Sequence, residues 1–308
     1  MMSPYVEAGG AAYELDAEWP RLPRGWVLEQ TSIATDSSDR VYLFNRGEHP
    51  VMVLSREGEL LDTWGEGFFG SAHGLFIDAD DALYLPNFRR HAVCKFSTTG
   101  ELLMTLGSLD QPGDPDWNGD VRAAIRAPLA RSHPPFICPT DVAVDRAGRI
   151  FCSDGYGNAR VHRFSKEGEL ECSWGEPGSE PGQFHVVHGI WVHVDGRVFV
   201  ADRENNRLQV FTSDGEVLDV WDGFDHPCDI FIDGDLIYIA EGAASSVSPI
   251  AADPSSFLQI RTLDGETVTR WSSPGGGGGH SVWIDSTGSI YVNQNQEGAR
   301  LVKYQRVH

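Results

Sequence analysis

Three histidines occupy the same position in alternate copies of a repeated sequence unit. Each copy opens with a short apolar segment, and the six copies begin at residues 31, 73, 140, 188, 228 and 280. The second, fourth and sixth copies open with His73, His188 and His280. If the copies surround an axis, these imidazoles meet at one centre, which suits a zinc ion with a fourth position left for substrate or water. We therefore predict a zinc site there, against the alternative of three unrelated, locally bonded histidines.

The repeated unit predicts four short strands. In the second copy these are the apolar segments within 73–78, 83–85, 93–96 and 102–107, separated by polar turns. Four strands recurring about every 40 residues are typical of a propeller blade. The copies resemble NHL repeats, whose propellers commonly have six blades. We predict a single-domain, all-β, six-bladed β-propeller with blades at 31–65, 73–107, 139–175, 187–222, 227–272 and 279–308. The last copy lacks its outer strand, which residues 13–19 are expected to supply, closing the ring.

Blade topology predicts that the irregular segments gather on one face. The connection into the innermost strand and the loop after the second strand emerge on the same side of an up-and-down blade. That side receives the three histidines, the glycine run 275–279, and the insertions 108–137 and 241–257, the first of which could hold a short helix. Asp141 and Asp229 follow the histidine position in odd-numbered copies and are expected to bind backbone N–H groups. Side chains expected to contact a substrate on this face are Asn87, Arg90, His185 and Asn158.

Several motifs together resemble the catalytic core of peptidyl-α-hydroxyglycine α-amidating lyase. They are Pro139-Thr-Asp-Val-Ala-Val144, Ser153-Asp-Gly-Tyr-Gly-Asn158, Pro181-Gly-Gln-Phe184, His188 and Ala201-Asp-Arg-Glu-Asn205. That family is a six-bladed propeller that holds zinc with three histidines and cleaves the N–C bond of an α-hydroxyglycine to give an amide and glyoxylate. The resemblance implies that Tyr156 is the catalytic base and that Arg46 and Arg203 flank the substrate. Such arginines would bind a carboxylate and neutralise developing negative charge.

Two departures from the family limit what the resemblance implies. Its calcium site uses an aspartate directly after the third histidine, where this chain has Ser281, so structural calcium is not expected. Its secreted members have a cysteine beside the tyrosine, where this chain has Gly157, and no disulfide is implied. The first insertion could also reshape the mouth of the site, so the chemistry could be kept while the substrate differs.

Composition excludes some partners. The formal net charge of −21 argues against nucleic acid, whose affinity depends on basic residues, and against an anionic membrane surface. Five cysteines cannot all pair, and the N-terminus does not resemble a signal peptide, so we expect free thiols and a cytoplasmic location. A small-molecule substrate is the expected partner, and the oligomeric state is left open.

Three functional hypotheses follow. The first is a zinc enzyme of the amidating-lyase type, acting by elimination or hydrolysis on a small hydroxylated amide or acid. The second is a zinc hydrolase or lactonase on the same ligands, which only product analysis distinguishes from the first. The third is a non-enzymatic NHL scaffold that binds protein, which would not need histidines in alternate copies.

Overall fold

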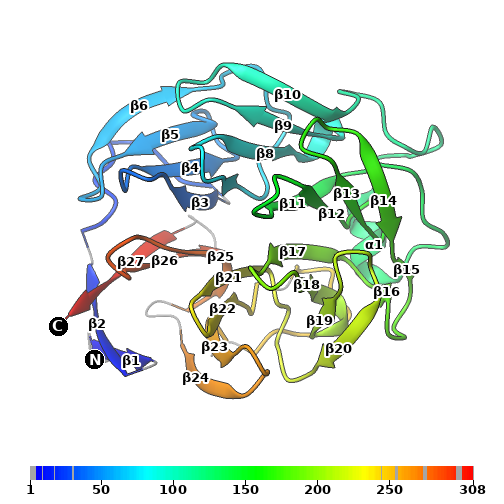
Figure 1. Ribbon diagram of the computed structural model, residues 1–308. Helices are drawn as coiled ribbons and strands as arrows, with labels where there is room; N and C mark the ends of the chain where they lie inside the picture. The colour runs from blue at the N-terminus through cyan, green and yellow to red at the C-terminus, as the bar shows by residue number, and fades with distance from the viewer. Residues whose placement is uncertain are drawn as a thin grey trace.

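Six antiparallel sheets of four or five strands surround a central axis in the computed structural model (Figure 1). The structure describes residues 5–8, 10–16, 18–29, 31–243, 245–253, 256–272, 276–295 and 300–307. In the first five sheets, the earliest strand in the sequence lies innermost and the latest lies outermost. The six-bladed, all-β propeller predicted from the repeats is therefore confirmed.

The first five blades use consecutive strands. Blade one consists of β3 (Thr31–Thr35), β4 (Val41–Asn45), β5 (Val51–Leu54) and β6 (Leu60–Trp64). Blade two consists of β7 (Phe76–Ile77), β8 (Leu83–Asn87), β9 (Ala92–Phe96) and β10 (Leu102–Gly107). Blade three consists of β11 (Pro139–Val144), β12 (Ile150–Asp154), β13 (Arg160–Phe164) and β14 (Leu170–Trp174). Blade four consists of β17 (Val187–Val192), β18 (Val198–Asp202), β19 (Arg207–Phe211) and β20 (Val217–Trp221). Blade five consists of β21 (Asp229–Asp233), β22 (Leu236–Ala240), β23 (Leu258–Thr262) and β24 (Thr267–Trp271).

The sixth blade joins both ends of the chain. It runs outward through β25 (Gly278–Ile284), β26 (Ile290–Asn295), β27 (Arg300–Val307), β2 (Ala11–Asp16) and β1 (Tyr5–Ala8). Strand β2 pairs antiparallel with β27, from Ala12 opposite Val307 to Asp16 opposite Lys303. The closing strand thus begins and ends earlier than the predicted 13–19, because Trp19 leaves the sheet and packs on Tyr291 with ring centroids 4.9 Å apart. Strand β1 was not predicted.

Tryptophans at the ends of outer strands seal neighbouring blades. The indoles of Trp64, Trp174 and Trp221 each lie against a turn glycine of the next blade, namely Gly100, Gly215 and Gly265. Those glycines have φ of 83°, 88° and 86°, and a Cβ on any of them would come within 3 Å of the indole. The glycine of the turn pattern x-x-Gly-Glu therefore leaves room for the tryptophan of the preceding blade.

Two short elements mark the irregular segments. The first insertion contains α1 (Val121–Arg126), whose N-cap Asp120 accepts hydrogen bonds from Arg122 N and Ala123 N. A parallel pair, β15 (Glu176–Pro177) and β16 (Gln183–Phe184), precedes blade four. Single turns of 3₁₀ helix follow β8 at Phe88–Arg90 and β18 at Arg203–Asn205.

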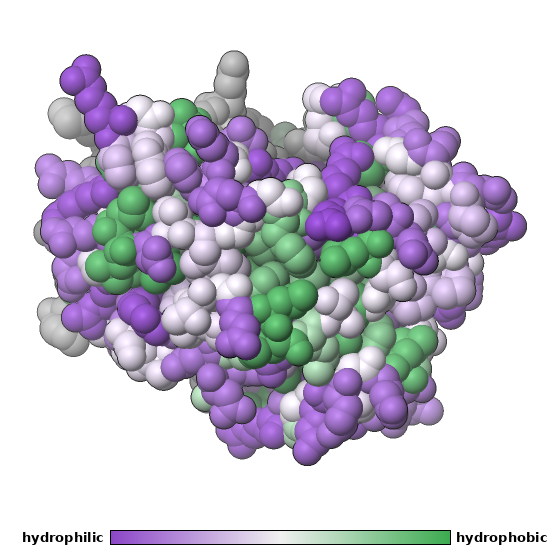
Figure 2. Space-filling view, turned by 90° about the horizontal axis from the view of Figure 1, so that it is seen from above, coloured by the Kyte–Doolittle hydropathy of each residue, from purple (hydrophilic) through white to green (hydrophobic). Residues whose placement is uncertain are grey.

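The surface is mainly hydrophilic. On the face shown in Figure 2, hydrophobic residues form separate patches between hydrophilic ones. Exposed apolar side chains include Leu61, Leu103 and Leu218, at or near the starts of outer strands. Among the described residues, no helix is both long enough and apolar enough to cross a membrane.

Candidate metal centre and active site

The three predicted metal ligands lie together on the axis. His188 is on β17 and His280 on β25, while His73 lies just before β7. One ring nitrogen from each can be chosen so that all three lie within 4.8 Å of one another. The ring centroids are 4.7 Å apart for His73 and His188, 5.1 Å for His188 and His280, and 5.5 Å for His73 and His280. Alternate blades therefore bring these imidazoles to one point.

The ring nitrogens at this point lack protein partners. All three side chains are buried, yet Nε2 of His73, Nε2 of His188 and both ring nitrogens of His280 have no hydrogen-bond partner in the described part of the chain. The carbonyl of Cys228 accepts a hydrogen bond from His188 Nδ1 at 2.7 Å, so the lone pair of the neutral imidazole is on Nε2. Because buried polar atoms are normally satisfied, these orphans fit a cation, and three imidazoles fit zinc.

The electrostatic setting also suits a metal. Burial lowers the pKa of His73, His188 and His280 well below the ordinary value, and nearby cationic groups lower it further. Neutral imidazole is the form that binds metal, so no proton must be displaced. A cavity of about 10 Å³ borders the three rings, which is room for one water molecule or one ion.

Side chains from the odd-numbered blades hold the backbone that carries the histidines. Asp141 Oδ2 accepts Ile190 N at 3.0 Å, and Asp229 Oδ2 accepts Val282 N at 2.9 Å. Each of these N–H groups lies two residues after a histidine of the next blade. In blade one the hydroxyl of Ser32 donates to the carbonyl of His73. Both aspartates thus bind backbone N–H groups, on the neighbouring strand rather than on a loop.

Asp229→Asn should change how stability depends on pH in metal-free protein. Burial raises the pKa of Asp229 and of Asp141, whose neighbouring charges disfavour each other. The folded state therefore keeps a proton that the unfolded chain loses near pH 4, and this contribution to stability is lost as pH rises towards neutrality. Asparagine keeps an acceptor for Val282 N without the charge, so the decline should become shallower. Denaturant unfolding between pH 4 and 8 measures the slope, with the exposed Asp233→Asn as control; equal slopes in all three proteins would contradict the prediction.

Tyr156 stands beside the histidines on the loop after β12. Its ring centroid is 5.7 Å from that of His73 and 5.9 Å from that of His188. The hydroxyl accepts a hydrogen bond from Arg203 Nη1 at 3.3 Å. Burial raises the pKa of the phenol, although the guanidinium groups of Arg203 and Arg46 act to lower it. At neutral pH the side chain therefore carries its proton in this protein.

The two predicted arginines also reach this centre. Arg203 is 3% exposed, donates from Nη2 to Ala243 O at 2.6 Å, and leaves Nε without a partner among the described residues. Burial opposes its charge, but Tyr156, Cys228 and Glu204 together raise its pKa. Arg46 donates to Ala72 O at 2.9 Å. Burial lowers the pKa of Arg46 to about 10, which leaves it positively charged at neutral pH.

Glu204 is the acidic partner that sequence reasoning missed. Its Oε1 lies 3.1 Å from Arg203 Nη1, and its Oε2 accepts the hydroxyl of Ser248 at 2.6 Å. The Ser248 hydroxyl also lies 3.1 Å from His226 Nε2. Glu204 could have been identified from the sequence, because it directly follows the candidate arginine in Ala201-Asp-Arg-Glu-Asn205.

Asn87, which the sequence predicts to contact substrate, is buried and binds the protein backbone. Its Oδ1 accepts Gly70 N at 2.9 Å, from the chain that leads into the same blade. The residues at the matching position of four other blades make the same contact, through Asn45, Asp154, Asp202 and Glu241. Aligning the ends of the second strands would have revealed a repeated structural position.

The other three predicted substrate contacts hold the first insertion. His185 Nε2 is 2.8 Å from Ala124 O in α1. Asn158 binds both the N–H and the carbonyl of His133, each at 3.0 Å. Arg90 pairs with Asp110 through two hydrogen bonds of 2.9 and 2.6 Å. These residues lie around the mouth, but their polar groups bind the insertion.

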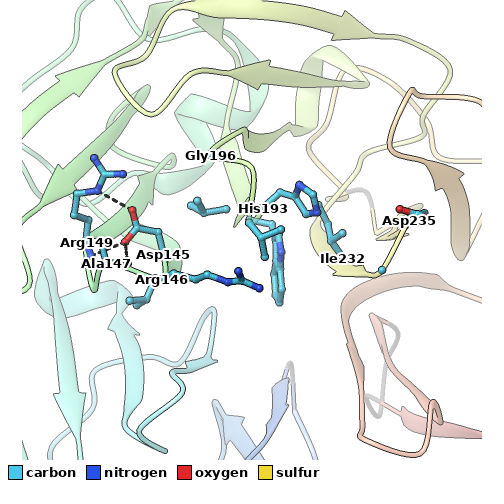
Figure 3. Close-up of a pocket in the computed structure, with 13 residues that line it drawn as sticks. Asp145, Arg146, Ala147, Arg149, His193, Gly196, Ile232 and Asp235 are labelled. Atoms are coloured by element: carbon cyan, nitrogen blue, oxygen red, sulfur yellow. Dashed lines mark hydrogen bonds and ion pairs between the residues drawn. The ribbon is translucent and has the colours of Figure 1, made fainter.

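A hollow of about 720 Å³ lies at the opposite end of the axis, where the turns after the innermost strands emerge. Figure 3 shows Arg146 reaching into it and Arg149 bound to Asp145, while His193 and Asp235 line other sides. No group of three possible metal ligands in the described chain lies there. This hollow is far larger than the cavity beside the histidines. The group of possible metal ligands nevertheless lies at the histidine centre, which is therefore the candidate active site.

Comparisons with known proteins agree with this architecture. The NHL repeat model matches residues 184–211. Human NHL repeat-containing protein 3 is 29% identical over 294 residues, covering 91% of this chain and 80% of that protein. A probable peptidyl-alpha-hydroxyglycine alpha-amidating lyase of Caenorhabditis elegans is 32% identical over 167 residues, covering 53% of this chain and 43% of that protein. A gluconolactonase of Xanthomonas campestris has the same fold, with a TM-score of 0.64, 13% identity, and coverage of 100% and 99% of the two chains.

Proposed function

We propose that this NHL-repeat propeller is a zinc-dependent lyase that cleaves the C–N bond of an N-acyl-α-hydroxyglycine or a similar small hydroxylated amide. The observation that carries the proposal is the group of orphaned ring nitrogens on His73, His188 and His280 beside Tyr156 and Arg203. The similarity to amidating lyases supports the same chemistry. Zinc held there would supply Lewis acidity to an oxygen of the substrate.

In this proposal Tyr156 moves the protons of the cleavage. The hydroxyl of the substrate loses its proton as the carbonyl forms, the C–N bond breaks, and the amide nitrogen gains a proton. The products are an amide and glyoxylate, and no oxidant or reductant is needed. A neutral phenol can relay the proton in one concerted step, in which its oxygen takes the hydroxyl proton while its own proton passes to nitrogen, so the raised pKa of Tyr156 does not prevent the role.

Arg203 and Arg46 supply the positive charge that a substrate carboxylate needs. Arg203 is held by Glu204 and Ala243, so its orientation is fixed before a substrate arrives and its Nε is available as a donor. A preorganised, buried guanidinium binds a carboxylate more strongly than an exposed one.

The test is elemental analysis of untagged protein followed by product analysis. We expect close to one zinc per chain, and we expect chelation to abolish turnover and added zinc to restore it. The reaction should release an amide and glyoxylate in equal amounts. A ring-opened acid from a lactone would instead favour the hydrolase, and protein that binds no zinc would refute both enzymes.

A further inference from the structure

The seam where the ring closes contains a cavity of about 600 Å³ lined mainly by charged side chains. Its basic side chains come from three parts of the chain: Arg21 from the segment after β2, Arg56 from the turn between β5 and β6, and Lys303 and Arg306 from β27. The carboxylates that line the cavity are Asp16 and Glu57, which leaves an excess of two positive charges. In a protein with a formal net charge of −21, this local excess runs against the overall composition.

Hydrogen bonds hold the three parts of the chain together around the cavity. The carbonyl of Arg56 accepts Trp19 Nε1 at 3.2 Å and Lys303 Nζ at 2.8 Å. The backbone N–H of Arg21 donates to Gly58 O at 2.9 Å. Figure 1 shows β2 and β27 side by side near the two chain ends. The cavity is therefore complete only when the first and last parts of the chain have come together.

The positive charges at this seam lack matching anions. Lys303 is 6% exposed, yet its ammonium forms no ion pair within the described part of the chain, and the Tyr291 ring centroid lies 5.1 Å away. Burial lowers the pKa of Lys303, although the charge of Asp285 acts to raise it. The exposed side chains of Arg21 and Arg306 have no hydrogen bond or ion pair with any described residue. Because a buried ammonium is seldom left without a counter-charge, the cavity is suited to an anion.

We propose that this cavity binds the phosphate group of a small anion, either inorganic phosphate or a phosphate monoester. A phosphate monoester carries about −1.5 to −2 charges at pH 7, which matches the positive excess of the lining. Arginines bind phosphate through paired hydrogen bonds, and an ammonium adds a point charge. The volume falls within the range of about 300 to 1,000 Å³ typical of small-molecule sites. Thr287 and Ser289, in the turn after β25, also line the cavity, which places it at the end of the axis opposite the histidines.

Thermal unfolding with added anions tests the proposal, because a ligand that contacts all three parts of the seam stabilises the closed ring. Inorganic phosphate, glycerol phosphate, glycerol and succinate are compared at constant ionic strength. At about ten times its dissociation constant, a phosphate compound should raise Tm by at least about 2 °C, with saturable binding in calorimetry. Tighter binding of glycerol phosphate would identify a monoester as the ligand, and equal binding would identify inorganic phosphate. An equal rise in Tm with succinate would overturn the assignment to phosphate.

Two variants separate the cavity from a general effect of salt. Arg21→Gln/Arg306→Gln removes two exposed guanidinium groups and should weaken phosphate binding at least about 10-fold. Lys303→Met keeps the buried stem without the ammonium and should remove the response to phosphate. The charge-matched control Arg122→Gln/Arg146→Gln, at exposed positions outside the cavity, should bind phosphate as the unmodified protein does. Absence of binding, or an equal rise in Tm in all of these proteins, would overturn the proposal.

Discussion

His188→Ala should abolish zinc binding at the proposed centre and, with it, nearly all turnover. Two imidazoles cannot hold the ion as three do, and even changes outside the ligand set cost 10- to 100-fold in metal affinity in other enzymes, so we expect a loss above about 100-fold. The buried His188 ring makes one hydrogen bond, to Cys228 O, and the fold should survive its removal. Elemental analysis and a zinc competition titration measure the effect.

His193→Ala is the matched control for this experiment. His193 directly follows the same strand, β17, but lies at the opposite end and pairs with Asp195 at 3.0 Å. The His193→Ala variant should therefore bind zinc and turn over substrate as the unmodified protein does. If His188→Ala kept a full complement of zinc with unchanged affinity, the three-histidine centre would have to be abandoned.

Tyr156→Phe should separate metal binding from turnover. The substitution removes one hydroxyl, so zinc content should remain near one per chain. Because a positioned acid–base group typically contributes that much, we expect kcat to fall by about 10²- to 10⁴-fold. The measurement is kcat and KM on metal-loaded protein, with KM changing less than kcat.

Tyr42→Phe provides the comparison for loss of a buried hydroxyl. Tyr42 is fully buried and donates to Asp36 at 3.2 Å, at the far end of blade one. Its removal should affect stability and leave kcat unchanged. Full activity in Tyr156→Phe would show that another group moves the protons.

The fold was predictable because each blade repeats the same local physics. Short apolar segments define the strands, and a carboxylate such as Asp36 binds the turn that follows, accepting Ser38 N and Arg40 N. The exact closing strand was less predictable, since β2 pairs with residues almost three hundred positions away. Its bounds depend on where Trp19 finds a packing site, which no local pattern specifies.

The three histidines could be predicted because they occupy one repeated position of the sequence unit. His73, His188 and His280 stand out because their equivalents in odd blades are Thr31, Thr140 and Cys228. The repeat also explains the backbone contact of Asn87, since its equivalents in four other blades bind backbone N–H groups as well. Polar residues that recur in every copy serve the blade, whereas those confined to some copies are candidates for chemistry.

The packing of the two insertions around Tyr156 could not be predicted, because it has no counterpart in other blades. Residues such as Ile125 and Val247 are ordinary apolar side chains in irregular segments, and only three-dimensional packing brings them to Tyr156. Likewise, the contact of His185 with Ala124 O joins residues 61 positions apart. Sequence reasoning placed the insertions near the mouth but could not give the contacts that they make there.

The sixth blade combines strands from both ends of the sequence, and this affects the order in which the histidine centre forms. His280 is on β25, and the sheet of that strand is finished only when β27 finds β2. Because β2 is made long before β27, the earlier blades can form first, and the histidine triangle is completed only when the sixth blade assembles. A chain that lacks this blade would therefore lack the third imidazole of the triangle.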